Sequence, residues 1–173
     1  NIGLTLFMLG NLEPAREQFA LAASELTRTG DVVMLNKVYS NLASICIALE
    51  RLEDARRYAR QLRHTSKQAG DRFFEAVSFG LEAEAANEGG EQRACIALCN
   101  SGLSLTNGDS TRVPAAYLRR VLADAYLALG NAAESVSLFQ AASDVFRSIG
   151  DQDELRKAES GLERARVLQG GAK

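Results

Sequence analysis

Apolar residues recur along this chain in steps of three and four, which is the spacing of one face of an α-helix. The stretch "VVMLNKVYSNLASICIALE" shows this at Leu35, Val38, Tyr39, Leu42, Ile45, Cys46 and Leu49. The stretch "EQFALAASEL" shows it again at Phe19, Ala22, Ala23 and Leu26. No segment alternates apolar and polar residues over the length of a strand. The pattern therefore predicts an all-α protein with helices of about 15–19 residues.

Two sets of markers divide these helices at regular intervals. Gly-Asp pairs place glycine at positions 30, 70, 108 and 150, with spacings of 40, 38 and 42. Between them, a second set recurs at a spacing of 40: Gly10, Glu50, Gly90 and Gly130. Two markers per period predict two helices per repeat. Internal repeats of this length are typical of solenoids, propellers and other repeat arrays.

The residue types at the markers suit the ends and starts of helices. Glycine adopts the left-handed backbone that closes a helix, and the next Asp can accept hydrogen bonds from the free N–H groups of the following helix. A stop and restart is predicted at Gly30-Asp31, Gly70-Asp71, Gly150-Asp151, Gly10-Asn11 and Gly130-Asn131. Pro14 and Pro114 are expected in the first turn of their helices, where a missing N–H costs little.

Aligning the repeats at a spacing of 40 reveals columns of small residues. One column holds Gly3, Ala43, Ala83 and Ala123, and another holds Ala15, Ala55, Cys95 and Ser135. A third column alternates large and small side chains: Phe19, Ala59, Cys99 and Phe139. Small residues at matched positions allow neighbouring helices to approach closely. The columns therefore predict interlocking helix pairs.

These columns resemble the tetratricopeptide repeat (TPR), with Leu-Gly and Tyr on its first helix and Ala-x-x-x-Phe on its second. The stretches "SNLASIC", "DARRYAR", "PAREQFALA" and "AESVSLFQAA" carry the match. The 40-residue period resembles long variants in leucine-glycine-asparagine adaptors, Rap-type regulators and maltose-activator-like bacterial regulators. The resemblance implies a right-handed α-solenoid of about four antiparallel helix pairs plus a capping helix.

The resemblance divides residues 1–173 into one array, which we expect to be a fragment of a longer chain. The predicted units are 1–31, 32–71, 72–109 and 110–151, with a capping helix over 152–168. The third unit departs most from the pattern. It has Glu82 where Leu is expected and a loose turn at Gly89-Gly90.

Composition and charge narrow the class of protein. Hydrophobic residues make up 46% of the chain and aromatic residues only 6%, which favours close-packed helices over a β-sandwich. The net charge of −2 does not favour direct contact with nucleic acid or an anionic membrane. No apolar run approaches the roughly 20 residues of a membrane span. Three cysteines without framework spacing indicate a reduced, cytoplasmic setting.

No group of residues in the sequence predicts catalysis, a cofactor or a metal site. The single histidine, His64, is expected on the surface, and Cys95 and Cys99 are expected in the core. Glu82, Glu84 and Glu88 are interpreted as an acidic helix face, although a paired-carboxylate enzyme stays open. The expectation is a protein that is not an enzyme.

The resemblance assigns the first helix of each unit to a concave groove that binds a partner. The groove residues that it implies are Lys37, Asn41, Ser44, Glu84, Tyr117, Arg120 and Asp124, with Lys157, Ser160 and Arg164 from the last helix. An Asn41 amide can both donate to and accept from a peptide backbone. Tyr and Arg often anchor interfaces. The alternative is that these are ordinary solvated polar residues.

A basic stripe follows one face of the helix predicted around residue 60. Arg56, Arg60, Arg63 and Lys67 are spaced by four, three and four residues, and the resemblance implies a convex position for them. They form either a solvated face or a docking surface for an acidic protein or nucleic acid.

The sequence thus predicts a non-catalytic scaffold that binds a peptide or protein segment in its groove. Alternatively, the chain is the sensor of a bacterial transcriptional or signalling regulator that responds to a small ligand or peptide. A homo-oligomer is a further option.

Overall fold

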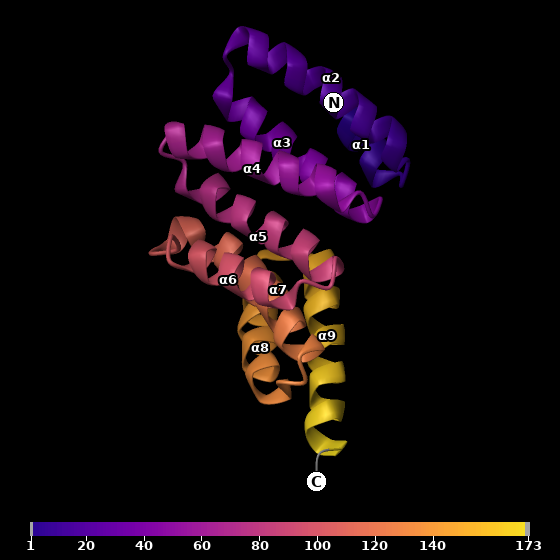
Figure 1. Cartoon of the computed structure of the whole chain (residues 1–173), viewed down its shortest axis with the longest axis vertical. Helices are drawn as coiled ribbons and strands as arrows, with labels where there is room; N and C mark the ends of the chain where they lie inside the picture. The colour runs from indigo at the N-terminus through magenta and orange to yellow at the C-terminus, as the bar shows by residue number, and fades with distance from the viewer. Residues whose placement is uncertain (1, 172–173) are drawn as a thin grey trace.

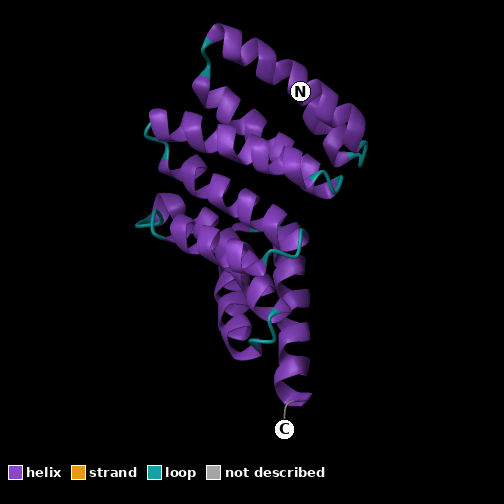
Figure 2. Ribbon diagram, in the orientation of Figure 1, coloured by secondary structure: helices purple, strands orange, loops and turns teal. Residues whose placement is uncertain are grey.

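The computed structural model describes residues 2–171, and within that range every regular element is helical (Figures 1 and 2). The elements are α1 (Ile2–Met8), α2 (Leu12–Thr29), α3 (Val32–Ala48), α4 (Leu52–Gln68), α5 (Arg72–Glu88), α6 (Gln92–Leu103), the 3-10 helix η1 (Asp109–Thr111), α7 (Arg112–Ala128), α8 (Ala132–Ile149) and α9 (Gln152–Gly171). They stack as an α-solenoid of helix pairs, and the predicted fold class is confirmed.

Successive helices pack side by side, joined by short turns, along the whole stack. The direction of the helices also changes along it: α2, α4 and α5 cross the view of Figure 1, whereas α9 runs along its vertical axis. The predicted unit ends at 31, 71 and 151 fall immediately before α3, α5 and α9, whereas 109 falls at the start of η1. The predicted capping helix lies within α9.

The turns form for the reasons that the sequence suggested, except at Asn11 and Asn131. Gly10, Gly30, Gly70, Gly90, Gly130 and Gly150 all have φ between 68° and 81°. The Oδ1 atoms of Asp31, Asp71 and Asp151 each accept a hydrogen bond at 3.1 Å from the amide three residues later. The Asn11 and Asn131 side chains form no such cap, so the capping role expected of them is wrong. Backbone bonds alone close those two turns.

Glu50 adopts the backbone that glycine adopts in the matching turns, with φ of 57°. The Glu50 amide donates to the Ile47 carbonyl at 2.9 Å, and the Arg51 amide donates to the Cys46 carbonyl at 2.8 Å. These two bonds form the Schellman end of α3. The pairing of the backbone offsets the cost of a left-handed conformation in a residue with a side chain.

The predicted columns of small residues lie in the core. Ala43, Ala83 and Ala123 have no exposed surface, and the column of Phe19, Ala59, Cys99 and Phe139 is buried throughout. At Gly161, an added methyl would fall 2.3 Å from the Phe139 ring, so this ring lies directly against the α9 backbone. Complementary large and small residues thus set the helix spacing.

The third pair of helices departs from the repeat at the end of α6 and not at Gly89-Gly90, so the expected loose turn is wrong: Gly90 has φ of 78° and the turn closes with the same backbone bonds as the others. Helix α6 ends at Leu103 after 12 residues, whereas α4 has 17. Gly108 has φ of 153° rather than the compact left-handed value of the other markers, and η1 leads into α7. Within the described range, none of the helices combines the length and the apolar character needed to cross a membrane.

Candidate partner-binding surface

The alternate helices α3, α5, α7 and α9 pack on one another in turn and form an inner layer of the solenoid. Two clefts open along this layer. The apolar cleft has a volume of about 420 Å³, and the side chains that line it include Ile47, Phe73, Val77, Leu81, Tyr117 and Phe146. The polar cleft has a volume of about 730 Å³, and its lining includes Asn87, Arg120, Asp124, Lys157, Ser160 and Arg164. Glu84 and Lys157 line both clefts.

The structure brings five of the seven groove residues of the sequence prediction to these clefts. Three line the apolar cleft: Ser44, Glu84 and Tyr117. Two further ones line the polar cleft: Arg120 and Asp124. Lys37 and Asn41 lie on α3 outside both linings. Lys37 is exposed and Asn41 is partly buried.

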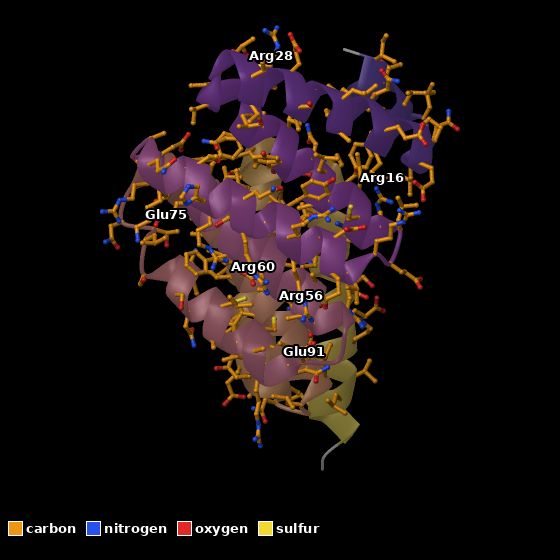
Figure 3. The ribbon with its side chains drawn as sticks, turned by 45° about the horizontal axis from the view of Figure 1, so that its top comes forward. Arg16, Arg28, Arg56, Arg60, Glu75 and Glu91 are labelled. Atoms are coloured by element: carbon orange, nitrogen blue, oxygen red, sulfur yellow. The ribbon has the colours of Figure 1, made fainter. Side chains whose placement is uncertain are left out.

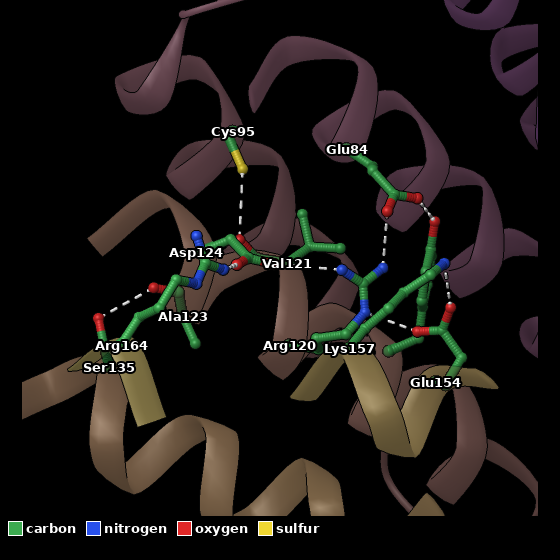
Figure 4. Close-up of polar contacts among 11 residues, drawn as sticks. Glu84, Cys95, Arg120, Val121, Ala123, Asp124, Ser135, Glu154, Lys157 and Arg164 are labelled. Carbon is green, nitrogen blue, oxygen red and sulfur yellow. Dashed lines mark hydrogen bonds and ion pairs between the residues drawn. The ribbon is translucent and has the colours of Figure 1, made fainter. Parts of the chain in front are cut away.

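Arg120 is the centre of an ion network that joins α5, α7 and α9 (Figure 4). Its Nη2 lies 2.7 Å from Glu84 Oε1, and its Nε lies 2.6 Å from Glu154 Oε2. Its Nη1 lies 3.2 Å from Asp124 Oδ2 on the same helix. Only 4% of the Arg120 side chain is exposed. The guanidinium therefore acts as a buried link between helices rather than as the exposed anchor that the sequence suggested.

Two exposed cations complete the network at its rim. Lys157 Nζ lies 2.7 Å from Glu154 Oε1, and Arg164 Nη2 lies 3.2 Å from Asp124 Oδ1. Three cations thus face three carboxylates, and the network as a whole is neutral. Neutrality matters here because an unpaired charge in a buried site is costly.

Burial and charge act in opposite directions on the acidic groups of the network. Burial raises the pKa of Glu84, but the Arg120 charge and the Tyr117 hydrogen bond lower it by more than burial raises it. The pKa of Glu84 therefore lies below its usual value. Burial raises the pKa of Asp124, and Arg120 and Arg164 only partly oppose it. Burial lowers the pKa of Arg120, but Glu84 and Glu154 raise it above its usual value. Glu84 is therefore held ionised.

The Tyr117 ring can lie against α5 because Gly80 on that helix has no side chain. A methyl on Gly80 would fall 2.5 Å from the Tyr117 ring, so the ring lies directly on the α5 backbone. In this position the Tyr117 hydroxyl donates to Glu84 Oε2. The Arg120 guanidinium lies 5.1 Å from the centre of the same ring. Tyr117 thus forms both part of the apolar wall and part of the ion network.

The sequence reasoning did not find Glu154, which ties α9 to Arg120. Glu154 lies one turn before Lys157 and follows the helix start that Asp151 caps. It falls outside the positions that the resemblance assigns to the groove. A search for carboxylates one turn before each predicted groove cation would have found it, because such residues lie on the same helix face.

The predicted basic stripe divides into paired and exposed parts. Arg56 Nη2 lies 2.7 Å from Glu91 Oε1 at the start of α6, and Figure 3 shows Arg56 and Arg60 side by side on α4 above Glu91. Arg60 Nε lies 2.8 Å from Glu82 Oε1, and Arg63 also contacts Glu82. Lys67 is exposed. The stripe is therefore largely a set of bridges from α4 to α5 and α6.

The interpretation of Glu82, Glu84 and Glu88 as one acidic face is wrong. Glu82 is buried toward the arginines of α4, whereas Glu84 faces Tyr117 and Arg120 of α7. Residues two apart lie on different sides of a helix, so the two carboxylates serve different interfaces. Glu88 is exposed at the edge of the polar cleft.

His64, Cys95 and Cys99, for which the sequence predicted no catalytic or metal-binding role, lie where the sequence placed them. His64 is exposed, and Cys95 and Cys99 are fully buried. Burial raises the pKa of Cys46 to about 11, and the hydrogen bond to Cys95 and burial raise that of Cys99. Among residues 2–171, no cluster of three or more His, Cys, Asp or Glu side chains is placed to hold a metal ion.

Comparisons with known proteins support the fold. No protein-family model and no curated protein matches the chain. A solved Podosopora anserina kinesin light chain-like protein of nearly identical TPR-like repeats superposes with a TM-score of 0.59 at 16% identity, covering 99% of this chain and 93% of that one. A second solved form of that protein, which carries a point substitution, superposes with a TM-score of 0.60 at 16% identity. This match covers 99% of this chain and 92% of that one. At this identity the likeness shows the fold alone, a TPR-like α-solenoid.

Proposed function

We propose that this chain is a non-catalytic scaffold that binds an extended segment of a partner protein along its inner layer, with apolar side chains of that segment in the apolar cleft. The observation that carries the proposal is the open apolar cleft itself, which is lined mainly by side chains from the alternate helices α3, α5, α7 and α9, with Phe146 of α8 beside them. TPR-like folds generally mediate protein interactions, and helical solenoids bind partners on extended concave surfaces.

The cleft combines apolar walls with polar groups that suit a peptide. Its volume of about 420 Å³ accommodates a few side chains, and Ser40 and Ser44 add hydroxyl groups to its α3 side. Outside the cleft lining, the Asn41 amide of α3 makes no hydrogen bond within residues 2–171, which leaves it free to bond the backbone of a peptide that extends beyond the cleft. Affinity would come from burial of apolar side chains, with these polar groups fixing the register.

The Arg120 network supports the same proposal by fixing the walls of the cleft. Glu84 and Glu154 belong both to the network and to the cleft lining. A surface held rigid before binding loses less conformational freedom when the partner binds. The network thus reduces the entropic cost of ordering α5, α7 and α9 around a ligand.

A sensor domain of a regulator is the second candidate, and it rests on the same network. The apolar cleft also has the size of a small-molecule site. Because Arg120 connects α5 to α9, a ligand that displaced Glu84 or Glu154 would shift these helices relative to each other. This behaviour would fit the long TPR variants of bacterial regulators. The buried free thiols support a cytoplasmic setting for either candidate.

A peptide selection followed by a matched pair of variants tests the scaffold proposal. A phage-displayed random peptide library is selected against the wild-type chain, and the affinity of the selected peptide is then measured by calorimetry. Ser44→Arg places a long cation in the apolar cleft, whereas Ser24→Arg makes the same change at an exposed site on α2. We expect Ser44→Arg to lower the affinity for the selected peptide by at least about tenfold, which corresponds to about 1.4 kcal/mol of binding free energy, and Ser24→Arg to leave it unchanged. Equal affinities of the two variants would refute the cleft as the site.

A further inference from the structure

A separate cleft on α4 has a lining that differs in charge from the others. It has a volume of about 450 Å³, and its lining is Tyr39, Arg57, Arg60, Gln61, His64 and Thr65. None of these side chains is acidic, whereas four other clefts on the described surface each include at least one carboxylate. It shares no residue with the apolar or polar cleft. We name it the α4 cleft.

The basic residues of the α4 cleft lie on one face of the helix and keep donors available. Arg57, Arg60 and His64 are separated by three and four residues, so their side chains are neighbours. Side-chain exposure is 59% for Arg57 and 62% for Arg60. His64 is exposed and makes no ion pair or hydrogen bond within residues 2–171.

The carboxylates near the cleft do not saturate these cations. Arg57 Nη2 contacts Asp54 at 2.8 Å, and Arg60 Nε contacts Glu82 at 2.8 Å. Each guanidinium has five N–H donors, so most of them remain available for a second acceptor. Arg63 also pairs with Glu82, which leaves Arg60 and Arg63 with a net charge of +1 against that single carboxylate.

We propose that the α4 cleft binds the carboxylate side chains of an acidic segment of a partner protein, at a site independent of the apolar cleft. Arginine side chains bind carboxylates with two parallel hydrogen bonds, and Gln61 and Tyr39 add neutral groups beside them. The small footprint favours a peptide over nucleic acid, because nucleic-acid affinity depends on neutralising many phosphates along a basic surface. Asp54 at the edge of the site and the net charge of −2 further disfavour a long nucleic-acid strand, which would extend past the three basic side chains of the cleft.

The single histidine of the chain provides a direct probe of this site. The ring proton resonances of His64 are followed by NMR while acetyl-hexaglutamate amide is added at constant pH. We expect a saturable shift, no shift with acetyl-hexaglutamine amide, and loss of the shift when the salt concentration rises from about 50 to about 500 mM. Absence of any hexaglutamate-induced shift at low salt would overturn the proposal.

A matched pair of variants separates local recognition from general attraction between charges. Arg57→Gln and Arg156→Gln both remove an exposed arginine that pairs with an aspartate three residues earlier. Both change the net charge equally, but only Arg57 lines the α4 cleft. We expect Arg57→Gln to weaken hexaglutamate binding by at least about threefold, and Arg156→Gln to leave it unchanged.

Two results would overturn the proposal, one from this comparison and one from a binding measurement with an oligonucleotide. Equal weakening by both variants would show that the peptide responds to overall charge only. Tighter binding of a single-stranded oligothymidylate of equal charge would assign the cleft to nucleic acid instead. Circular dichroism of each variant establishes that its helix content is retained, so that a loss of binding reports on the site.

Discussion

Replacing Arg120 by methionine removes the cation that links α5, α7 and α9 while keeping a side chain of similar length. The substitution leaves Glu84, Asp124 and Glu154 facing one another, with side-chain exposures of 17%, 22% and 18%. Removing one partner of a buried ion pair costs about 3–5 kcal/mol because the remaining charge is uncompensated. Since Lys157 and Arg164 still neutralise part of the site, we expect a loss near the lower end, about 3 kcal/mol.

The loss of unfolding free energy in Arg120→Met should change with pH, and the charges around Glu84 determine the direction of that change. In the wild type, the pKa of Glu84 lies below its usual value, so its contribution to stability is present above the unfolded pKa and is lost as pH falls through the folded pKa. Without Arg120, the largest remaining effect on Glu84 is burial, which raises its pKa. The variant then loses stability as pH rises through that raised value. The difference between the two proteins is therefore expected to grow from acidic to neutral pH.

Urea unfolding followed by circular dichroism measures this difference at several pH values. Arg119→Met is the matched control, because Arg119 neighbours Arg120 in sequence and makes no ion pair within the described part of the chain. We expect the control to change the free energy of unfolding by less than about 0.5 kcal/mol. A loss below about 1 kcal/mol for Arg120→Met at neutral pH, or a loss that does not change with pH, would refute the reasoning.

Two further substitutions test how the backbone positions these residues. Gly30→Val should lower the free energy of unfolding by about 1–2 kcal/mol, because Gly30 has φ of 76° and an added Cβ meets no atom within 4 Å, which leaves backbone strain as the cause. An unchanged melting temperature would contradict this turn assignment. Gly80→Ala should lower the free energy of unfolding by about 1–3 kcal/mol, because the new methyl displaces the Tyr117 ring. In the Tyr117→Ala background the same change should cost much less, and equal costs in the two backgrounds would contradict the contact.

The fold could be predicted because its turns either have a local cause or follow from the 40-residue repeat. Asp31, Asp71 and Asp151 cap the helices that follow them, and this role depends only on residues within one turn. Glu50 shows how far the repeat itself determines the backbone. Its position in the 40-residue register, rather than its residue type, predicts the left-handed turn that it forms.

The site could be predicted only in part, because pairing between helices is not a local property. The register places Arg120 and Glu84 on the inner layer, but it does not show that their charges meet there. That contact depends on the close approach of α7 to α5, which the absence of a side chain at Gly80 permits. The same limit applies to Glu82, which the repeat pattern identifies as a departure but whose partners lie on α4.

Photo-crosslinking of the selected peptide tests the proposed binding site most directly. Ala48 lines the apolar cleft and is exposed at the end of α3, whereas Ala141 is exposed on α8 away from it. Each position is replaced in turn by benzoylphenylalanine, and the crosslinked product is identified by mass spectrometry. A peptide adduct at position 48 and none at position 141 is the predicted result. Adducts at position 141 alone, or equally at both, would contradict binding along the inner layer.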